Sequence, residues 1–260
     1  MSTQPPFPEP IPSAAQPPQP GLSVPSRIIN IFIAPRKTFE DLKVNASWWS
    51  PWVLTSIFLL LFAFVVGQKV DMVRFTRQQI EQSKFAQRQM EQLSPQQQEQ
   101  NIRIRAIATK VGFFIFPIGT LIGGLIIAAI LMGVFNFVFA AEVPYGRALA
   151  IVFYSFVPRI IYMVLLIVSL LASADPNTID ISANPMPTNP GFFMDPQGSK
   201  FLFGLASGLD LFALWVVALL GFGFSAASSN RKFTPGTAIS TVMVLYGVLI
   251  LAGAALKAAF

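Results

Sequence analysis

Residues 111–140 read VGFFIFPIGTLIGGLIIAAILMGVFNFVFA, a run of 30 residues without a charged side chain. A helix needs about 20 mostly apolar residues to cross a bilayer, so this run is long enough to span one. The whole chain agrees, because 53% of its 260 residues are hydrophobic and only 12% are charged. Soluble domains carry about 25% charged residues. We therefore expect lipid to surround much of this protein.

Five runs in all have the length and composition of membrane spans. They cover residues 49–67, 111–140, 148–171, 201–227 and 236–256. The predicted fold is an all-α integral membrane protein, built as a bundle of five transmembrane helices. Because the second run is longer than a bilayer is thick, we expect its helix to tilt, protrude or kink at Pro117.

The segments outside the spans differ from one another in composition. Residues 1–26 hold nine of the 21 prolines, which predicts a disordered Pro-rich tail ahead of a membrane domain at 27–257. Residues 68–110 contain eleven glutamines and eight basic residues. Within them Ser94 and Gln97 have the pattern of a capping box, which predicts an extramembrane helical hairpin whose second helix runs into the second span. A solvated linker helix with no binding partner is the favoured interpretation of this hairpin.

Two short amphipathic helices are predicted between the tail and the first span, the first of them capped by Ser26. The second places Phe39 and Leu42 on one side and Arg36 and Lys37 on the other. This pattern predicts an interfacial N-terminal helix pair that lies on the membrane, with these four residues as a candidate surface for a partner protein or anionic lipid. An anchor that only orients the first span is the alternative.

Two ionisable residues, Arg159 and Asp210, lie well inside apolar runs. A single charge at a helix centre costs about 2.5–3.5 kcal/mol on insertion scales. Because the third and fourth spans run antiparallel, both residues are predicted at similar depth, and we expect them to form an intramembrane ion pair. No histidine and no third intramembrane carboxylate extends the pair into a relay, so a structural role is favoured over an ion pathway.

Two pairs of glycines have the spacing of helix-packing motifs. Gly119 with Gly123, and Gly204 with Gly208, form small-xxx-small pairs on predicted spans. Such pairs let two helices approach closely. We expect both pairs to pack against helices of the same chain rather than to form a homodimer, and a homo-oligomer is left open.

The chain contains no Cys and no His, which excludes the usual zinc sites, cysteine nucleophiles and Ser-His-Asp triads. It also lacks a GxSxG motif and a Gly-rich phosphate loop that ends in Lys-Ser or Lys-Thr. We therefore expect no catalytic, cofactor-binding or metal-binding residues, and so no enzyme. The net charge of +6 comes from basic residues scattered between the spans, which does not indicate nucleic-acid binding.

Several stretches resemble the bacterial branch of the Yip-domain family, which is named from Ypt-interacting protein. They are Ala34-Pro35-Arg36-Lys37-Thr38-Phe39, Trp48-Trp49-Ser50-Pro51, Leu93-Ser94-Pro95 and Leu209-Asp210-Leu211-Phe212-Ala213-Leu214-Trp215. The resemblance covers about residues 27–257 and implies five spans with a cytosolic amino terminus. In eukaryotes, relatives of this family associate with Rab-type GTPases and other membrane proteins during vesicle traffic, as adaptors without known catalysis.

The first functional hypothesis is a non-catalytic membrane adaptor that binds other membrane or membrane-associated proteins. The alternative is a small transporter or channel in which Arg159 and Asp210 line a polar path. We expect the protein in a bacterial cytoplasmic membrane with its N-terminus in the cytoplasm, because basic residues at 27–43 and 231–232 flank the spans on that side. The eight basic residues of 68–110 would then lie outside, against the same rule.

Overall fold

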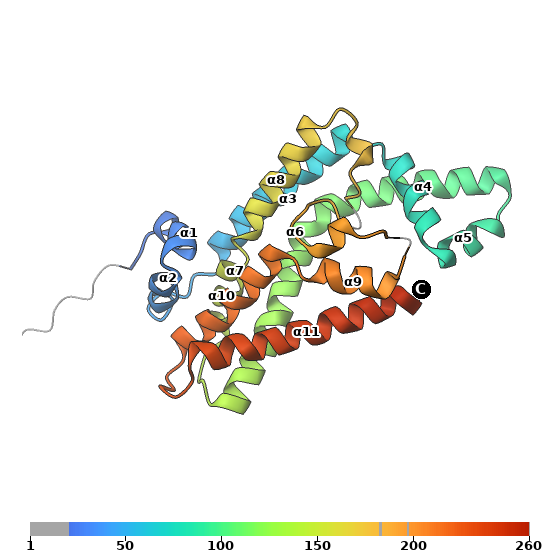
Figure 1. Ribbon diagram of the computed structural model, residues 1–260. Helices are drawn as coiled ribbons and strands as arrows, with labels where there is room; N and C mark the ends of the chain where they lie inside the picture. Colours follow the sequence, from blue (N-terminus) through green and yellow to red (C-terminus); the bar gives the residue numbers. More distant parts are fainter. Residues whose placement is uncertain (1–20, 182–183, 197, 260) are drawn as a thin grey trace, which may run out of the picture.

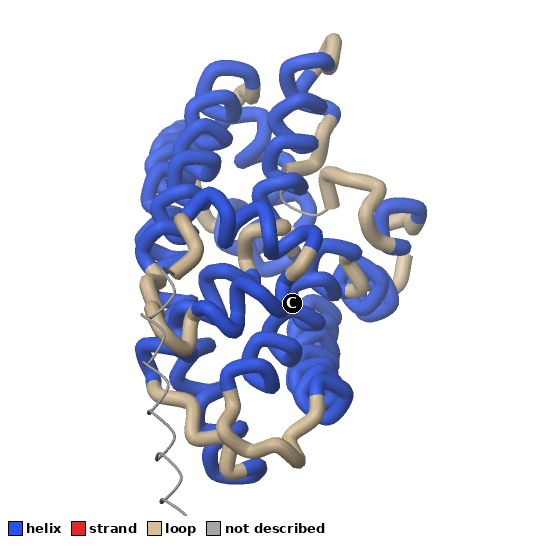
Figure 2. The backbone as a smooth tube through the Cα atoms, turned by 90° about the vertical axis from the view of Figure 1, so that its left-hand side faces the viewer, coloured by secondary structure: helices blue, strands red, loops and turns tan. Residues whose placement is uncertain are grey.

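The computed structural model describes residues 21–181, 184–196 and 198–259, and this part of the chain consists of helices and loops without a strand (Figures 1 and 2). Residues 1–20, which hold most of the predicted tail, lie outside the described residues. The predicted all-α fold is confirmed. The helices are α1 (Val24–Ile33), α2 (Pro35–Asp41), α3 (Trp49–Lys69), α4 (Met72–Gln82), α5 (Lys84–Glu91), α6 (Pro95–Phe139), α7 (Tyr145–Ser155), α8 (Arg159–Ala172), α9 (Lys200–Gly208), α10 (Leu211–Ala227) and α11 (Pro235–Ala259), with 3-10 turns η1 (Pro176–Thr178) and η2 (Pro190–Phe193).

Residues 21–26 belong to the folded part of the chain, which corrects the predicted boundary of the tail. Ser23, not Ser26, caps α1, and its side chain accepts a hydrogen bond from the Ser26 amide. Pro25 fits inside the first turn of α1, where its missing N–H is not needed, so the helix starts before it. The Leu22 amide donates to the Asp41 carboxylate at 2.9 Å, which fastens the start of α1 to the end of α2.

Four segments are each long and apolar enough to cross a membrane, namely α3, α6, α7 together with α8, and α11. A fifth crossing requires α9 and α10 together, and this pair is bent by 53° at its break. The break, at Leu209 and Asp210, corrects the continuous fourth span predicted at 201–227. The third span also has a turn, at 156–158, where Pro158 lacks the amide that a continuous helix would use.

α6 is 45 residues long and forms both the second span and the second arm of the extramembrane hairpin. It starts at the predicted capping box, in which Ser94 and Gln97 each bond the backbone of the other. α4 packs against its first half, and Glu99 of α6 pairs with Arg77 of α4 at 2.5 Å and with Arg103 at 3.3 Å. The structure therefore contains the predicted helical hairpin, with its first arm divided into α4 and α5, and its second helix continues into the second span.

Polar contacts between loops and helix ends show which ends of the helices lie on the same side of the bundle. At one end, the Ser229 amide of the α10–α11 loop donates to a carbonyl of the α6–α7 loop at 3.2 Å. Arg147 of α7 donates to the Lys43 carbonyl after α2, also at 3.2 Å. At the other end, Arg74 of α4 pairs with Asp175 of the α8–α9 loop at 3.4 Å. Successive connections thus alternate between two ends, as five crossings require.

The N-terminal helices pack on the bundle and join its core. The ring of Phe39 on α2 lies 6.3 Å from that of Phe222 on α10, and the ring of Phe32 on α1 lies 5.7 Å from that of Trp215. The core continues through α7, in which every residue from Ala148 to Ser155 is buried. α7 contacts α1, α3, α6 and α10, so it forms the centre of the bundle.

Candidate functional site

Asp210 lies at the break between α9 and α10 and caps α10. One of its carboxylate oxygens accepts hydrogen bonds from the amides of Phe212 and Ala213, each at 3.0 Å. A carboxylate at this position satisfies free amides and lies at the positive end of the helix dipole. Asp210 therefore has a structural role as the N-cap of α10, and this role does not require a basic partner for its carboxylate.

The α8–α9 loop folds over this break (Figure 1). The Thr188 hydroxyl donates to the second carboxylate oxygen of Asp210, and the Leu211 amide donates to the Thr188 carbonyl at 2.9 Å. The loop is itself tied by the side-chain amides of Asn184 and Asn189, which exchange two hydrogen bonds of 2.7 Å. Together these bonds satisfy the polar groups that a broken span exposes, as a low-dielectric surrounding requires.

α11 closes the other side of the break. Its Tyr246 hydroxyl donates to the Gly208 carbonyl at 2.7 Å, a group that the end of α9 leaves without a helical partner. A Cβ on Gly208 would lie 2.7 Å from Ile250, and one on Gly204 would lie 3.0 Å from Ala254. Gly204 and Gly208 thus face α11 and permit its close approach, which is the within-chain contact that their spacing predicts.

Arg159 is not joined to Asp210 by the ion pair expected from the sequence. The pair is not among the salt bridges between described residues, and the oxygens of Asp210 already accept three hydrogen bonds. Arg159 is exposed and lines a groove of about 280 Å³ between α3, α6 and the α7–α8 span. The two charged side chains therefore do not form the expected intramembrane ion pair within the described residues.

Three glycines on one side of α6 have open space beside them. A Cβ built on Gly112, Gly119 or Gly123 would have no heavy atom within 4 Å among the described residues, apart from the helix's own backbone and chain neighbours. At 3.6 residues per turn these three residues, here called the glycine face, lie within roughly 40° of one another around the axis. The within-chain packing expected of Gly119 and Gly123 is thus not observed. The adjacent Gly124 differs, because a Cβ there would lie 2.6 Å from the Phe153 ring.

The four residues of the predicted partner or lipid surface separate into two pairs. Phe39 and Leu42 are fully buried, because α2 packs its apolar side on α10. Arg36 and Lys37 are exposed, and Arg36 pairs with Glu40 at 2.7 Å on the same helix. The amphipathic pattern identified the apolar side of α2, but the structure covers that side with this chain instead of another protein or lipid.

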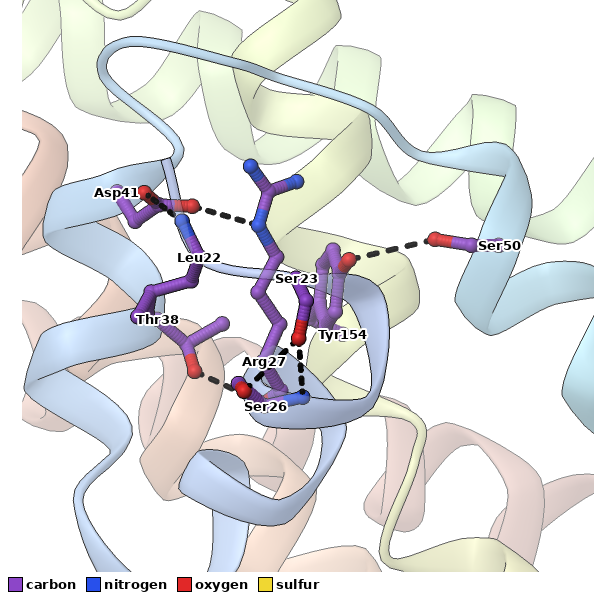
Figure 3. Close-up of polar contacts among 8 residues, drawn as sticks. All are labelled: Leu22, Ser23, Ser26, Arg27, Thr38, Asp41, Ser50 and Tyr154. Atoms are coloured by element: carbon purple, nitrogen blue, oxygen red, sulfur yellow. Dashed lines mark hydrogen bonds and ion pairs between the residues drawn. The ribbon is translucent and has the colours of Figure 1, made fainter. Parts of the chain in front are cut away.

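The sequence did not single out Arg27, whose side chain on α1 is only 2% exposed. Its Nε donates to the Asp41 carboxylate at 2.5 Å, and the Thr38 hydroxyl donates to its carbonyl at 2.9 Å (Figure 3). Beside it, the hydroxyls of Ser50 and Tyr154 lie 3.3 Å apart. The only sequence signal was a basic residue in the first turn of an apolar helix. Such a residue is usually exposed.

At the opposite end of the bundle, Asp175 joins the α8–α9 loop to the extramembrane hairpin. Hydrogen bonds from the Asn177 side chain and backbone hold the pKa of Asp175 below its usual value. Arg74 of α4, 3.4 Å away, acts in the same direction. Asn177 also accepts a hydrogen bond from the Asp71 amide at 2.7 Å, so this cluster is an exposed clasp between two segments.

The described residues contain no group of three or more His, Cys, Asp or Glu placed to hold a metal ion. The Yip1 domain matches residues 29–255. No curated protein and no solved structure matches the chain. The matched region includes the apolar crossings, the extramembrane hairpin and the capped break at Asp210. The chain therefore belongs to the Yip1-domain family and is a polytopic membrane protein.

Proposed function

We propose that this protein is a non-catalytic adaptor of the bacterial branch of the family, and that it binds other integral membrane proteins within the bilayer. The contact we assign is the glycine face of α6, formed by Gly112, Gly119 and Gly123. One observation carries the proposal, namely that the space beside all three glycines is empty in the described chain. α11 instead occupies the space beside the glycines of the other predicted pair, which lie on α9.

A glycine face on a spanning helix favours another helix as its partner. Lipid removes the hydrophobic drive between helices, so their association depends on close van der Waals packing and weak backbone contacts. Glycine permits both, although it costs roughly 1 kcal/mol relative to alanine in a helix. A Cβ on any of the three would meet no other heavy atom within 4 Å in the described chain, which supports a contact of this face with another chain.

Bulky substitutions on the glycine face test this proposal. A Cβ at Gly119 or Gly123 would meet nothing within 4 Å, so we expect Gly119→Leu and Gly123→Leu to fold and to lose the proteins that crosslink to the wild type in native membranes. Gly247→Leu on α11 is the matched control, because that glycine is also open. An unchanged set of crosslinked proteins in both α6 variants contradicts the proposal, and so does an equal loss in the control.

Transport is a second function that one observation favours. The α9–α10 span is broken at a carboxylate, with a bend of 53°, and broken spans hold substrates and ions in many transporters. The alternative path through Arg159 and Asp210 is weakened because the carboxylate is already bonded within the chain. Ion flux through purified protein in liposomes, abolished by Asp210→Asn, would replace the adaptor proposal with this one.

We further propose a bacterial cytoplasmic membrane as the location, with the N-terminus in the cytoplasm. The end of the bundle that holds α2 and the α10–α11 loop carries Lys37, Arg231 and Lys232, all exposed, as the positive-inside rule favours for cytoplasmic loops. Because the chain has no cysteine, single cysteines can report orientation. In intact cells an impermeant reagent should label Gln92→Cys and not Ser229→Cys. The reverse pattern contradicts the orientation.

A further inference from the structure

A recess of about 700 Å³ lies between the start of α1 and the segment that leads from α2 into α3. Its lining combines a guanidinium, two small polar side chains and two indoles, contributed by Arg27, Asn45, Ser47, Trp48 and Trp49. The recess is separate from the glycine face of α6 and from the break at Asp210, so its use does not depend on the adaptor proposal.

Arg27 directs two unused donor groups at this recess. Its Nε is bound to one oxygen of Asp41, whose other oxygen accepts the Leu22 amide at 2.9 Å. This arrangement fixes the guanidinium. Neither Nη group has a hydrogen-bond partner among the described residues, and Figure 3 shows both directed away from Asp41, toward the segment that joins α2 to α3. Because the side chain is almost fully buried, the recess faces a rigid pair of donors.

The residues around the recess indicate its level in the membrane and its charge. Trp48 and Trp49 precede and begin the spanning helix α3, and indoles favour the level of the lipid headgroups. Arg147 bonds the Lys43 carbonyl of the same segment at 3.2 Å, and its Nε is buried without a partner. Neither Lys43 nor Arg147 belongs to a salt bridge of the described residues. Lys43 and Arg147 therefore add positive charge beside the segment that lines the recess.

We propose that this recess binds the phosphate of an anionic phospholipid headgroup, with the two Nη groups of Arg27 as its main donors. A guanidinium presents its N–H groups in a planar fork that matches two phosphate oxygens. Asn45 and Ser47 supply further polar contacts, and the indoles of Trp48 and Trp49 cover the glycerol and the upper acyl chains. Free phosphate offers the same polar chemistry, but it would leave the apolar part of the lining exposed.

Lipid retention by the full-length protein tests this proposal. Purified protein in detergent would be titrated with phosphatidylglycerol, phosphatidylcholine or inorganic phosphate, and bound lipid would be counted by native mass spectrometry. Ser47→Trp places an indole in the lining of the recess and leaves both Arg27 and Asp41 in the sequence, and Arg27→Lys keeps the charge but removes the fork. Lys37→Ala, an exposed basic residue outside the recess lining, controls for general attraction to anionic lipid.

The wild type and Lys37→Ala should each retain one phosphatidylglycerol in preference to phosphatidylcholine. Ser47→Trp and Arg27→Lys should bind it at least about tenfold more weakly, since a charge-assisted hydrogen bond contributes more than that factor. Equal retention by Ser47→Trp, or equal retention of both lipids by the wild type, overturns the proposal. Saturation of the site by inorganic phosphate alone overturns its assignment to lipid. If Arg27→Lys does not fold, Ser47→Trp alone decides the outcome.

Discussion

Replacement of Asp210 by Ala should destabilise the protein through the break between α9 and α10, and not through a lost ion pair. The substitution removes two hydrogen bonds to the first amides of α10 and one from Thr188. Loss of an N-cap costs about 0.5–2 kcal/mol, and loss of a hydrogen bond to a charged acceptor costs about 1.5–3 kcal/mol. We therefore expect a loss of about 2–5 kcal/mol in the free energy of unfolding.

Arg159→Leu should cost far less, because this side chain is exposed in a groove and has no ion-pair partner in the described chain. The two substitutions should then be additive to within about 0.5 kcal/mol, as for residues that share no contact. The assay is a double-mutant cycle, in which unfolding of both single variants and of the double variant is titrated with denaturing detergent in mixed micelles.

The outcome that refutes this reasoning is a strong coupling between the two substitutions. If Asp210→Ala is rescued by Arg159→Leu, by about 1.5 kcal/mol or more, the two charges stabilise each other directly. Asp210→Asn supplies a check on the cap itself, since an amide oxygen still accepts the two backbone bonds. It should cost about 1 kcal/mol, clearly less than Asp210→Ala.

Three further predictions concern the N-terminal helices and the exposed clasp. Phe39→Ala should lower the free energy of unfolding by about 3–5 kcal/mol, measured by thermal unfolding in detergent, because the ring is fully buried; normal stability with a changed set of partners would contradict its core position. Asp41→Asn should cost about 3–5 kcal/mol, since it leaves Arg27 buried without its ion partner, and an unchanged melting temperature would contradict the pairing. The folded-state pKa of Asp175 is lowered, so its contribution to stability is present above the ordinary pKa and is lost as pH falls through the folded value. Asn177→Ala should reduce this loss of melting temperature at acid pH. An identical pH profile in the wild type and the variant would contradict the clasp.

Hydropathy and capping patterns were sufficient to predict the helices that cross the membrane and the hairpin outside it. A run such as 111–140 has one stable solution in lipid, because only a helix satisfies its backbone internally. Ser94 and Gln97 marked the start of α6 for an equally local reason, since a capping box uses residues within one turn. Both signals are contained in a few adjacent residues.

The break at Asp210 shows what such local signals miss. Hydropathy is the same for a continuous span and for a bent one, so the run 201–227 did not reveal a turn. One signal was available, because Gly208 followed by Asp210 before a new apolar run has the form of a helix end and a helix start. The stabilising contacts come from Thr188 and Tyr246. Both residues lie on other segments, so no local sequence pattern connects them to the break.

The positions of Phe39 and Arg27 were unpredictable for a related reason. An amphipathic pattern states which side of α2 is apolar, but it does not state whether lipid, a partner or α10 covers that side. Phe39 packs beside Gly223 of α10, where a Cβ would approach its ring to 2.9 Å. The buried side chain of Arg27 pairs with Asp41, which lies 14 residues later on the next helix. That contact depends on the angle between the two helices.

A photo-crosslinking residue at Gly119, compared with one at Gly247, tests most directly whether the glycine face of α6 binds another spanning helix. Both positions are open in this chain, so each reports whatever lies against it in native membranes. A protein crosslinked from position 119, absent from position 247 and lost when Gly123→Leu is added, is the predicted result. Crosslinks to lipid alone from position 119, or the same proteins from both positions, would contradict the assignment of this face as the binding surface.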